Sequence, residues 1–168
     1  MKVLKTSLDD KSMALDGLSK ELSDMNVKLE QTSRGLTLTI VDSLLYTPGE
    51  AELSKDGQAL VGKVSDILKK NFPNRELVVE GHTDNVPIVH SGWHSNWELG
   101  AARALTLVHE LTDAQKFDPA LVSATSYGEF RPTSTNATDE GRKLNRRAVI
   151  VILPEKLTVE RKSLASAN

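Results

Sequence analysis

The chain has 168 residues, of which 39% are hydrophobic and 26% charged, ordinary proportions for a globular domain. Its formal net charge of −2 argues against a general binder of nucleic acids or other polyanions. The chain contains no cysteine, which excludes disulfides and thiolate metal sites, and no apolar run approaches the roughly 20 residues of a membrane-spanning helix.

The first 33 residues carry a seven-residue repeat of apolar side chains. Leucine recurs at every seventh position and further apolar residues occupy the interleaved positions: Leu8, Leu15, Leu22 and Leu29, with Leu4, Leu18 and Met25. This pattern is typical of the a and d positions of a coiled coil, so we predict an amphipathic helix over residues 1–33 that pairs two copies of the chain as a homodimer. A helix that packs its apolar stripe against its own domain is the alternative.

A globular domain is predicted over residues 34–154. The alternation of apolar and polar residues from Leu36 to Val41 predicts a strand with one buried face. A helix is expected to open at residues 54–56, and its apolar stripe comprises Leu60, Val64, Ile67 and Leu68. The run from Glu76 to Glu80 is rich in β-branched residues and predicts a buried strand that ends at Gly81.

The second half of this domain continues the alternation of helices and strands. A helix beginning near Ser95 or Asn96 is expected to bury the stripe Trp97, Ala101, Ala104, Leu105, Val108 and Leu111. A strand is predicted over residues 121–127, and the apolar run at residues 147–153 predicts a central strand covered on both faces. The tail, residues 155–168, lacks periodicity and is expected to be loosely ordered.

These elements predict an α/β fold with the order β-α-β-α-β-β, in which helices pack on a small sheet after the N-terminal coiled-coil helix. Helical crossovers allow the first three strands to run parallel.

The candidate site is the segment between Glu80 and Ala104. Asp84 follows the carboxyl end of a predicted strand, which is where ligands settle in open α/β sheets. Asn96 and Arg103 are seven residues apart and share one flank of the following helix, away from the expected apolar stripe. We therefore expect Asp84 and Arg103 to grip a ligand that carries both an ammonium and a carboxylate, and Arg103 to contribute little to stability.

Three ordered motifs give this segment a family resemblance: GHTD at residues 81–84, NWELGAARA at 96–104 and GRKLNRRAVI at 141–150. Together they resemble the OmpA-like peptidoglycan-binding domain, and most of all its MotB-like branch. The chain departs from the usual family pattern at Gly100, where that family generally has serine, and in its long loop at residues 85–95.

The resemblance implies an OmpA-like sandwich with a mixed sheet, whose last strand runs opposite to the others and brings Arg146 toward Asp84. It implies that Asp84 and Arg103 hold the zwitterionic end of a stem-peptide residue such as diaminopimelate, with further contacts from Asn96 and Arg146. It also implies a non-catalytic anchor in the periplasm or cell envelope, without a cofactor, that belongs to a membrane-tethered or outer-membrane protein.

Two other functions are open to the same residues. His82, Asp84, His90 and His94 could form a divalent-metal site of a hydrolase, although their spacing matches no established ligand pattern. Binding of nucleic acid through the arginines near residue 146 is disfavoured, because they lead into an apolar strand. Trp97 is expected in the core, whereas Trp93 in the loop is a candidate for stacking on a sugar.

Overall fold

The computed structural model describes residues 2–89 and 92–155, with side chains described from residue 11. Apart from Glu155, the tail predicted to be loosely ordered lies outside the described residues. In chain order the elements are α1 (Lys2–Ser23), β1 (Lys28–Thr32), β2 (Gly35–Val41), η1 (Asp42–Leu44), α2 (Lys55–Asn71), β3 (Leu77–His82), α3 (Asn96–His109), η2 (Glu110–Ala114), η3 (Pro119–Leu121), β4 (Val122–Gly128), α4 (Asp139–Asn145) and β5 (Arg147–Ile152).

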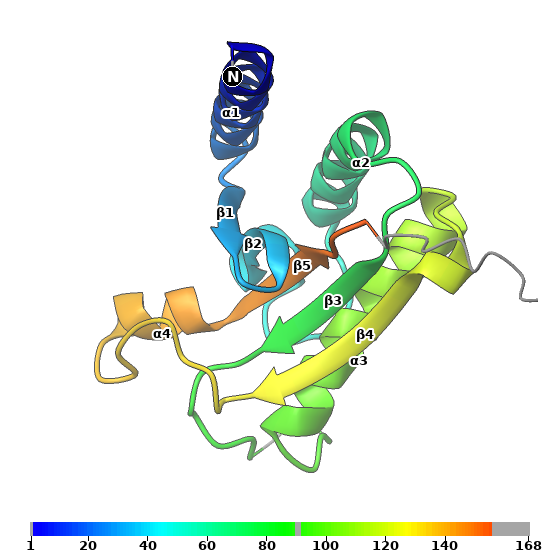
Figure 1. The fold of residues 1–168 in the computed structure, drawn as a ribbon. Helices are drawn as coiled ribbons and strands as arrows, with labels where there is room; N and C mark the ends of the chain where they lie inside the picture. The colour runs from blue at the N-terminus through cyan, green and yellow to red at the C-terminus, as the bar shows by residue number, and fades with distance from the viewer. Residues whose placement is uncertain (1, 90–91, 156–168) are drawn as a thin grey trace, which may run out of the picture.

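The sheet has five strands in the order β1-β2-β5-β3-β4. β5 pairs antiparallel with both β2 and β3, and β3 pairs parallel with β4, so β2, β3 and β4 all run in one direction. This arrangement confirms the predicted mixed sheet with a reversed last strand (Figure 1). All six residues of β5 are buried, as expected for a central strand.

The N-terminal helix is shorter than predicted. α1 ends at Ser23, and residues Lys28–Thr32 form strand β1, which pairs antiparallel with β2. The helix stops because Asn26 adopts a left-handed conformation with φ of 58°, and the Val27 N–H donates to the Leu22 carbonyl at 2.9 Å, a Schellman-type cap. The seven-residue spacing from Leu22 to the strand residue Leu29 is therefore a coincidence, and the predicted helix boundary at residue 33 is wrong.

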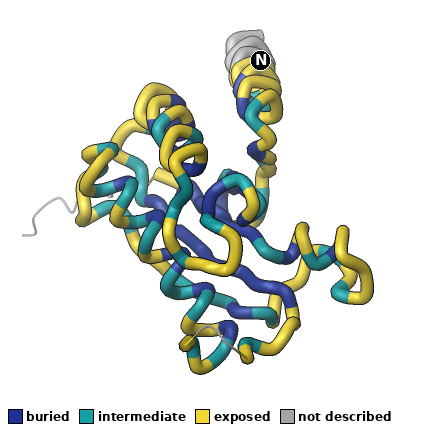
Figure 2. The backbone as a smooth tube through the Cα atoms, turned by 180° about the vertical axis from the view of Figure 1, so that it is seen from behind, coloured by how far each residue is buried: buried dark blue, intermediate teal, exposed yellow. Residues whose placement is uncertain are grey.

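The apolar stripe of α1 is divided between two environments. Leu18 and Leu22 are buried and join the core of the domain, as the alternative of a helix packed on its own domain expects. Farther toward the N-terminus the helix projects away from the sheet, and the stripe residue Leu15 is only partly buried (Figures 1 and 2). Within residues 2–89 and 92–155, no helix combines the length and the apolar character needed to cross a membrane.

Helix α3 lies against β3 and β4, but with a different face from the predicted one (Figure 1). Its buried residues are Asn96, Gly100, Arg103, Ala104 and Leu107. Trp97 and Leu105, which were expected in the core, are 46% and 49% exposed. The prediction is wrong at these two positions, but it holds at Ala104 and Leu111, which are buried, and at Val108, which packs against the core. It was displaced because the buried face carries two polar side chains, which made the face beside it seem more apolar.

The close approach of α3 to the sheet depends on glycine at two positions. A Cβ atom at Gly81 would lie 1.9 Å from the backbone oxygen of Gly100, and a Cβ at Gly100 would lie 2.4 Å from the Oγ atom of Ser126. A side chain at Gly81 would therefore push the helix away from β3. This contact also accounts for glycine at position 100, since the space that a serine side chain would need is taken by Ser126.

Candidate functional site

The candidate site forms where β2 and β3 end and β5 begins. Because β5 is antiparallel to both neighbours, its first residues lie beside the last residues of the two flanking strands. Asp42 follows β2, Asp84 follows β3, and Arg146 immediately precedes β5. The Asp42 N–H donates to the Arg146 carbonyl at 2.9 Å, so the backbone places these residues side by side. The predicted approach of Arg146 to Asp84 is confirmed.

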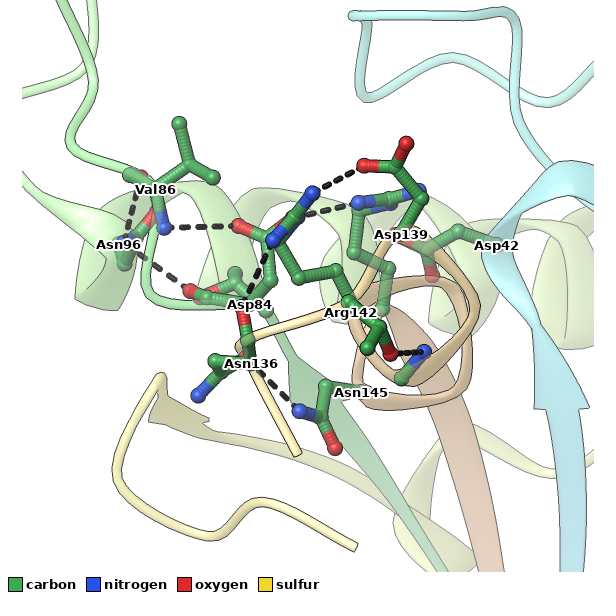
Figure 3. Close-up of polar contacts among 12 residues, drawn as sticks. Asp42, Asp84, Val86, Asn96, Asn136, Asp139, Arg142 and Asn145 are labelled. Atoms are coloured by element: carbon green, nitrogen blue, oxygen red, sulfur yellow. Dashed lines mark hydrogen bonds and ion pairs between the residues drawn. The ribbon is translucent and has the colours of Figure 1, made fainter. Parts of the chain in front are cut away.

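Asp84 is buried, and both of its carboxylate oxygens have partners. Its Oδ1 accepts a hydrogen bond from the Val86 N–H at 3.0 Å, and its Oδ2 lies 2.5 Å from the Nη1 atom of Arg146 (Figure 3). The Asn96 side-chain amide donates to the backbone oxygens of Asp84 and Val86 at 3.3 and 3.2 Å. Asn96 therefore shapes the loop that carries the carboxylate.

Arg103 does not pair with Asp84, which corrects the predicted clamp. Its Nη1 atom lies 2.5 Å from the Oδ2 atom of Asp42, and its Nε donates to the Glu50 carbonyl at 3.1 Å. The guanidinium also lies over the ring of Tyr46, 5.4 Å from the centroid, and the Tyr46 hydroxyl donates to the Arg103 carbonyl at 2.8 Å. With only 7% of the residue exposed, Arg103 is a buried structural residue as well as a neighbour of the site.

Asp42 is the member of this cluster that the sequence interpretation missed. Burial raises the pKa of its carboxyl to about 6, although the charges of Arg103 and Arg146 oppose this effect. At neutral pH the carboxylate is therefore ionised, and it depends on these arginines for compensation. A signal was present in the sequence, since Asp42 follows a predicted parallel strand just as Asp84 does.

The four charged side chains differ in their access to solvent. The side chain of Arg146 is 35% exposed, whereas those of Asp84, Asp42 and Arg103 are 9–10% exposed. Arg146 is thus the arginine of this cluster that a ligand can reach with the least rearrangement. Asp84, its direct partner, is the carboxylate that would be released if Arg146 turned toward a ligand.

The strand that leads to Asp84 carries a second buried cluster. Glu80 forms an ion pair with Arg34, and its Oε2 atom lies 3.1 Å from the Nε2 atom of His82. The His82 ring stacks on Tyr127 with centroids 5.3 Å apart, and its Nδ1 atom is buried without a hydrogen-bond partner. Burial lowers the pKa of His82, although Glu80 opposes this effect. Burial alone would raise the pKa of Glu80, but the hydrogen bonds from His82 and Arg34 lower it.

Two of the four residues of the metal-site alternative have other partners. His82 faces Glu80, Asp84 pairs with Arg146, and His94 is exposed. His90 lies outside the described residues. Among the residues that are described, no three histidine, aspartate or glutamate side chains gather as a metal ion would require. The geometry therefore gives the hydrolase alternative no support.

Helix α4 and the preceding loop support the start of β5. Asn145 is fully buried, and its side chain accepts from the Ser134 N–H at 2.9 Å and donates to the Asn136 side chain at 2.8 Å. Arg142 forms an ion pair with Asp139 and donates to the Asn136 carbonyl at 2.7 Å (Figure 3). These contacts fix the chain immediately before Arg146, and the sequence interpretation did not identify the role of Asn145.

Comparison with known proteins finds a family and several relatives that match this chain. The model of the OmpA family matches residues 45–146. Motility protein B of Bacillus subtilis is 40% identical over 128 residues, covering 76% of this chain and 49% of that protein. Uncharacterized protein YtxE of the same organism is 32% identical, covering 89% of this chain and 63% of that protein. The chain thus spans less than two thirds of the length of these curated relatives.

Solved structures of similar proteins share the fold of this chain. The cell wall anchor of the T6SS from Pseudomonas aeruginosa superimposes with a TM-score of 0.73 at 30% identity, covering 82% of this chain and 94% of that one. The periplasmic domain of MotB from Helicobacter pylori superimposes with a TM-score of 0.70 at 27% identity, covering 77% and 83% of the two chains.

Replacing Arg103 with alanine should destabilise the protein, because Asp42 would be left buried and unpaired. We expect a loss of about 3–5 kcal/mol in the free energy of unfolding, measured by urea denaturation. Lys143→Ala, which removes an exposed positive charge, should change stability by less than about 0.5 kcal/mol. Adding Asp42→Asn to Arg103→Ala should recover part of the loss. Equal stability of Arg103→Ala and the parent chain would contradict the structural role.

The buried His82 should make stability depend on pH. Because its pKa is lowered in the folded state, its contribution is fully present above about pH 6.5, the ordinary histidine pKa, and is lost as the pH falls toward the folded-state value. The readout is the free energy of unfolding of the parent minus that of His82→Gln between pH 8 and 5. This difference should shrink below about pH 6.5, and a constant difference would refute the expectation. The titration of Asp42 is common to both proteins and cancels.

Proposed function

Because the chain belongs to the OmpA family, we propose that it binds bacterial peptidoglycan without catalysis and anchors an envelope protein to the cell wall. The observation that carries this proposal is the Asp84–Arg146 pair, which lies at the carboxyl edge of the sheet with one partner buried and the other one third exposed. The name of the similar Pseudomonas protein, a cell wall anchor, supports the same function. The domain acts in the periplasm or cell envelope, as the similar Helicobacter domain is periplasmic.

The ligand group is the zwitterionic end of a stem-peptide residue, with diaminopimelate as the best fit. In the free protein, Asp84 and Arg146 neutralise each other. A ligand with adjacent ammonium and carboxylate groups replaces this single ion pair by two ion pairs. Its ammonium pairs with Asp84 and its carboxylate pairs with Arg146. No buried charge is then left alone, whereas a simple carboxylate would take Arg146 and leave Asp84 uncompensated. The exchange thus favours a zwitterion over a plain anion.

Arg103 and Asn96 support this site indirectly, by positioning other residues. Arg103 compensates Asp42, which lies beside Arg146, and so leaves Arg146 available to the ligand. Asn96 uses its amide hydrogens to hold the loop around Asp84. Both residues position the binding pair, a role that differs from the direct contact expected from the sequence.

Substitutions in the pair should weaken binding strongly while the protein stays folded. Asp84→Asn keeps the shape and removes the partner of the ammonium, which should weaken binding by about 2–5 kcal/mol, at least about 30-fold. Arg146→Lys should also bind poorly, because an ammonium cannot reproduce the planar guanidinium contact. Co-sedimentation with purified diaminopimelate-type peptidoglycan measures binding, and thermal unfolding reports folding.

The matched control for lost positive charge is Lys143→Ala, on an exposed position of α4 near Arg146. It should pellet with peptidoglycan as the parent does. Peptidoglycan with lysine in place of diaminopimelate supplies the ammonium without the neighbouring carboxylate and should bind more weakly. Full binding by folded Asp84→Asn would eliminate the proposed contact.

Homodimerisation through the first half of α1 is part of this proposal. Leu18 and Leu22 pack into the chain's own core, which leaves Leu8 and Leu15 as the seam for a second copy. The double substitution of Leu8 and Leu15 by lysine should give a monomer in sedimentation velocity. Substituting Thr6 and Met13 by lysine adds the same charge on the opposite side of the helix and should leave the dimer intact. A parent chain that is monomeric at tens of micromolar would exclude the dimer.

A further inference from the structure

Two aromatic rings stack on each other at the surface beside the Asp84–Arg146 pair. Trp97 is 46% exposed and Phe130 is 62% exposed, and their ring centroids lie 5.2 Å apart with an interplanar angle of 27°. Leaving large apolar rings in water is unfavourable. The two rings in contact form a small continuous apolar surface that is accessible to a ligand.

The backbone holds this pair firmly. The Ser126 hydroxyl donates to the Trp97 carbonyl at 2.9 Å, and the Trp97 N–H donates to the Ser95 hydroxyl at 3.2 Å. Gly128, with φ of 55°, lets the chain turn under the indole: a Cβ atom there would lie 3.5 Å from the Cδ2 atom of Trp97. These contacts fix the backbone of Trp97, and stacking places the ring of Phe130 against its indole before a ligand arrives.

The aromatic pair is continuous with the proposed binding site. Trp97 directly follows Asn96, whose side chain holds the loop of Asp84. On the other side, the Thr83 N–H donates to the Gly128 carbonyl at 2.9 Å, and Phe130 is two residues farther along. In Figure 1 the end of β4 and the first turn of α3 lie beside the end of β3. A ligand held at Asp84 thus has its neighbouring groups within reach of the rings.

We infer that Trp97 and Phe130 form a platform on which a pyranose ring of the peptidoglycan glycan strand stacks. This inference rests on the proposed function, because the stem peptide is attached to such a sugar. Three peptide residues extend at most about 10 Å, so the sugar stays close to a stem peptide gripped at Asp84. The faces of aromatic rings carry partial negative charge, which suits the C–H bonds on the face of a sugar ring. Phe130, without polar atoms and with the greater exposure, is the ring that meets the ligand.

A protein partner fits the surface less well than a sugar. A stable protein interface buries about 1,200–2,000 Å² in total, much more than two rings provide. The residues beside the platform are polar, with Ser95 hydrogen-bonded to Glu98 on the first turn of α3. Hydroxyl and carboxylate groups around an aromatic face are suited to the hydroxyl groups at the rim of a sugar.

The test compares two synthetic ligands by calorimetry: a diaminopimelate-containing tripeptide, and the same tripeptide attached to its N-acetylated disaccharide. The parent protein should bind the disaccharide–tripeptide about fivefold or more tightly than the free tripeptide, as expected for one aromatic contact. Phe130→Ala should abolish this preference and leave the affinity for the free tripeptide unchanged. Phe130→Tyr should retain the preference because it keeps the ring.

The control is Leu105→Ala, which removes an exposed apolar side chain from the same helix away from the platform and should keep the preference. Thermal unfolding verifies that each variant is folded. If the parent binds both ligands equally, or if Phe130→Ala keeps the preference, the platform is refuted while the stem-peptide site stands. If the free tripeptide does not bind, or binds Asp84→Asn equally well, the proposed function itself fails and the platform with it.

Discussion

The requirement that buried charges be paired governs the carboxyl edge of this sheet. Asp42 and Asp84 follow two parallel strands, β2 and β3, that flank β5, and these carboxylates would repel each other in a poorly solvated place. The antiparallel β5 inserts between those strands and brings Arg146 into the gap, while α3 supplies Arg103 from the side. Arg146 and Arg103 thus supply the positive charges that the two buried carboxylates require.

The same constraint links stability to recognition. Arg103 and Asp42 are almost completely enclosed, so losing either partner would leave a buried charge uncompensated and would destabilise the fold. Arg146 and Asp84 lie at the boundary with solvent, and in the proposed mode of binding they exchange partners without leaving either charge unpaired. Under this proposal the depth of an aspartate–arginine pair below the surface decides whether it acts in stability or in recognition.

Much of the fold follows from the sequence, because strands such as β5 and the parallel crossovers have strong local patterns. The family resemblance of the three motifs correctly predicted that Arg146 lies close to Asp84. The partner of Arg103 was not predictable from helical periodicity, since Asn96 and Arg103 made the buried face of α3 seem polar and moved the expected core to Trp97. Strand β1 was missed because Leu29 continues the heptad count by chance, and the left-handed Asn26 that ends the helix has no apolar signal.

The charge cluster has consequences for the way a ligand approaches. Its two carboxylates and two guanidiniums sum to zero, so at distances beyond about 10 Å the site presents almost no net field at physiological salt. We expect long-range steering to contribute little and the association rate to change little with ionic strength. Among the many fixed charges of a cell wall, such a site would be neither attracted nor repelled at long range. It would discriminate between ligands only by direct contact.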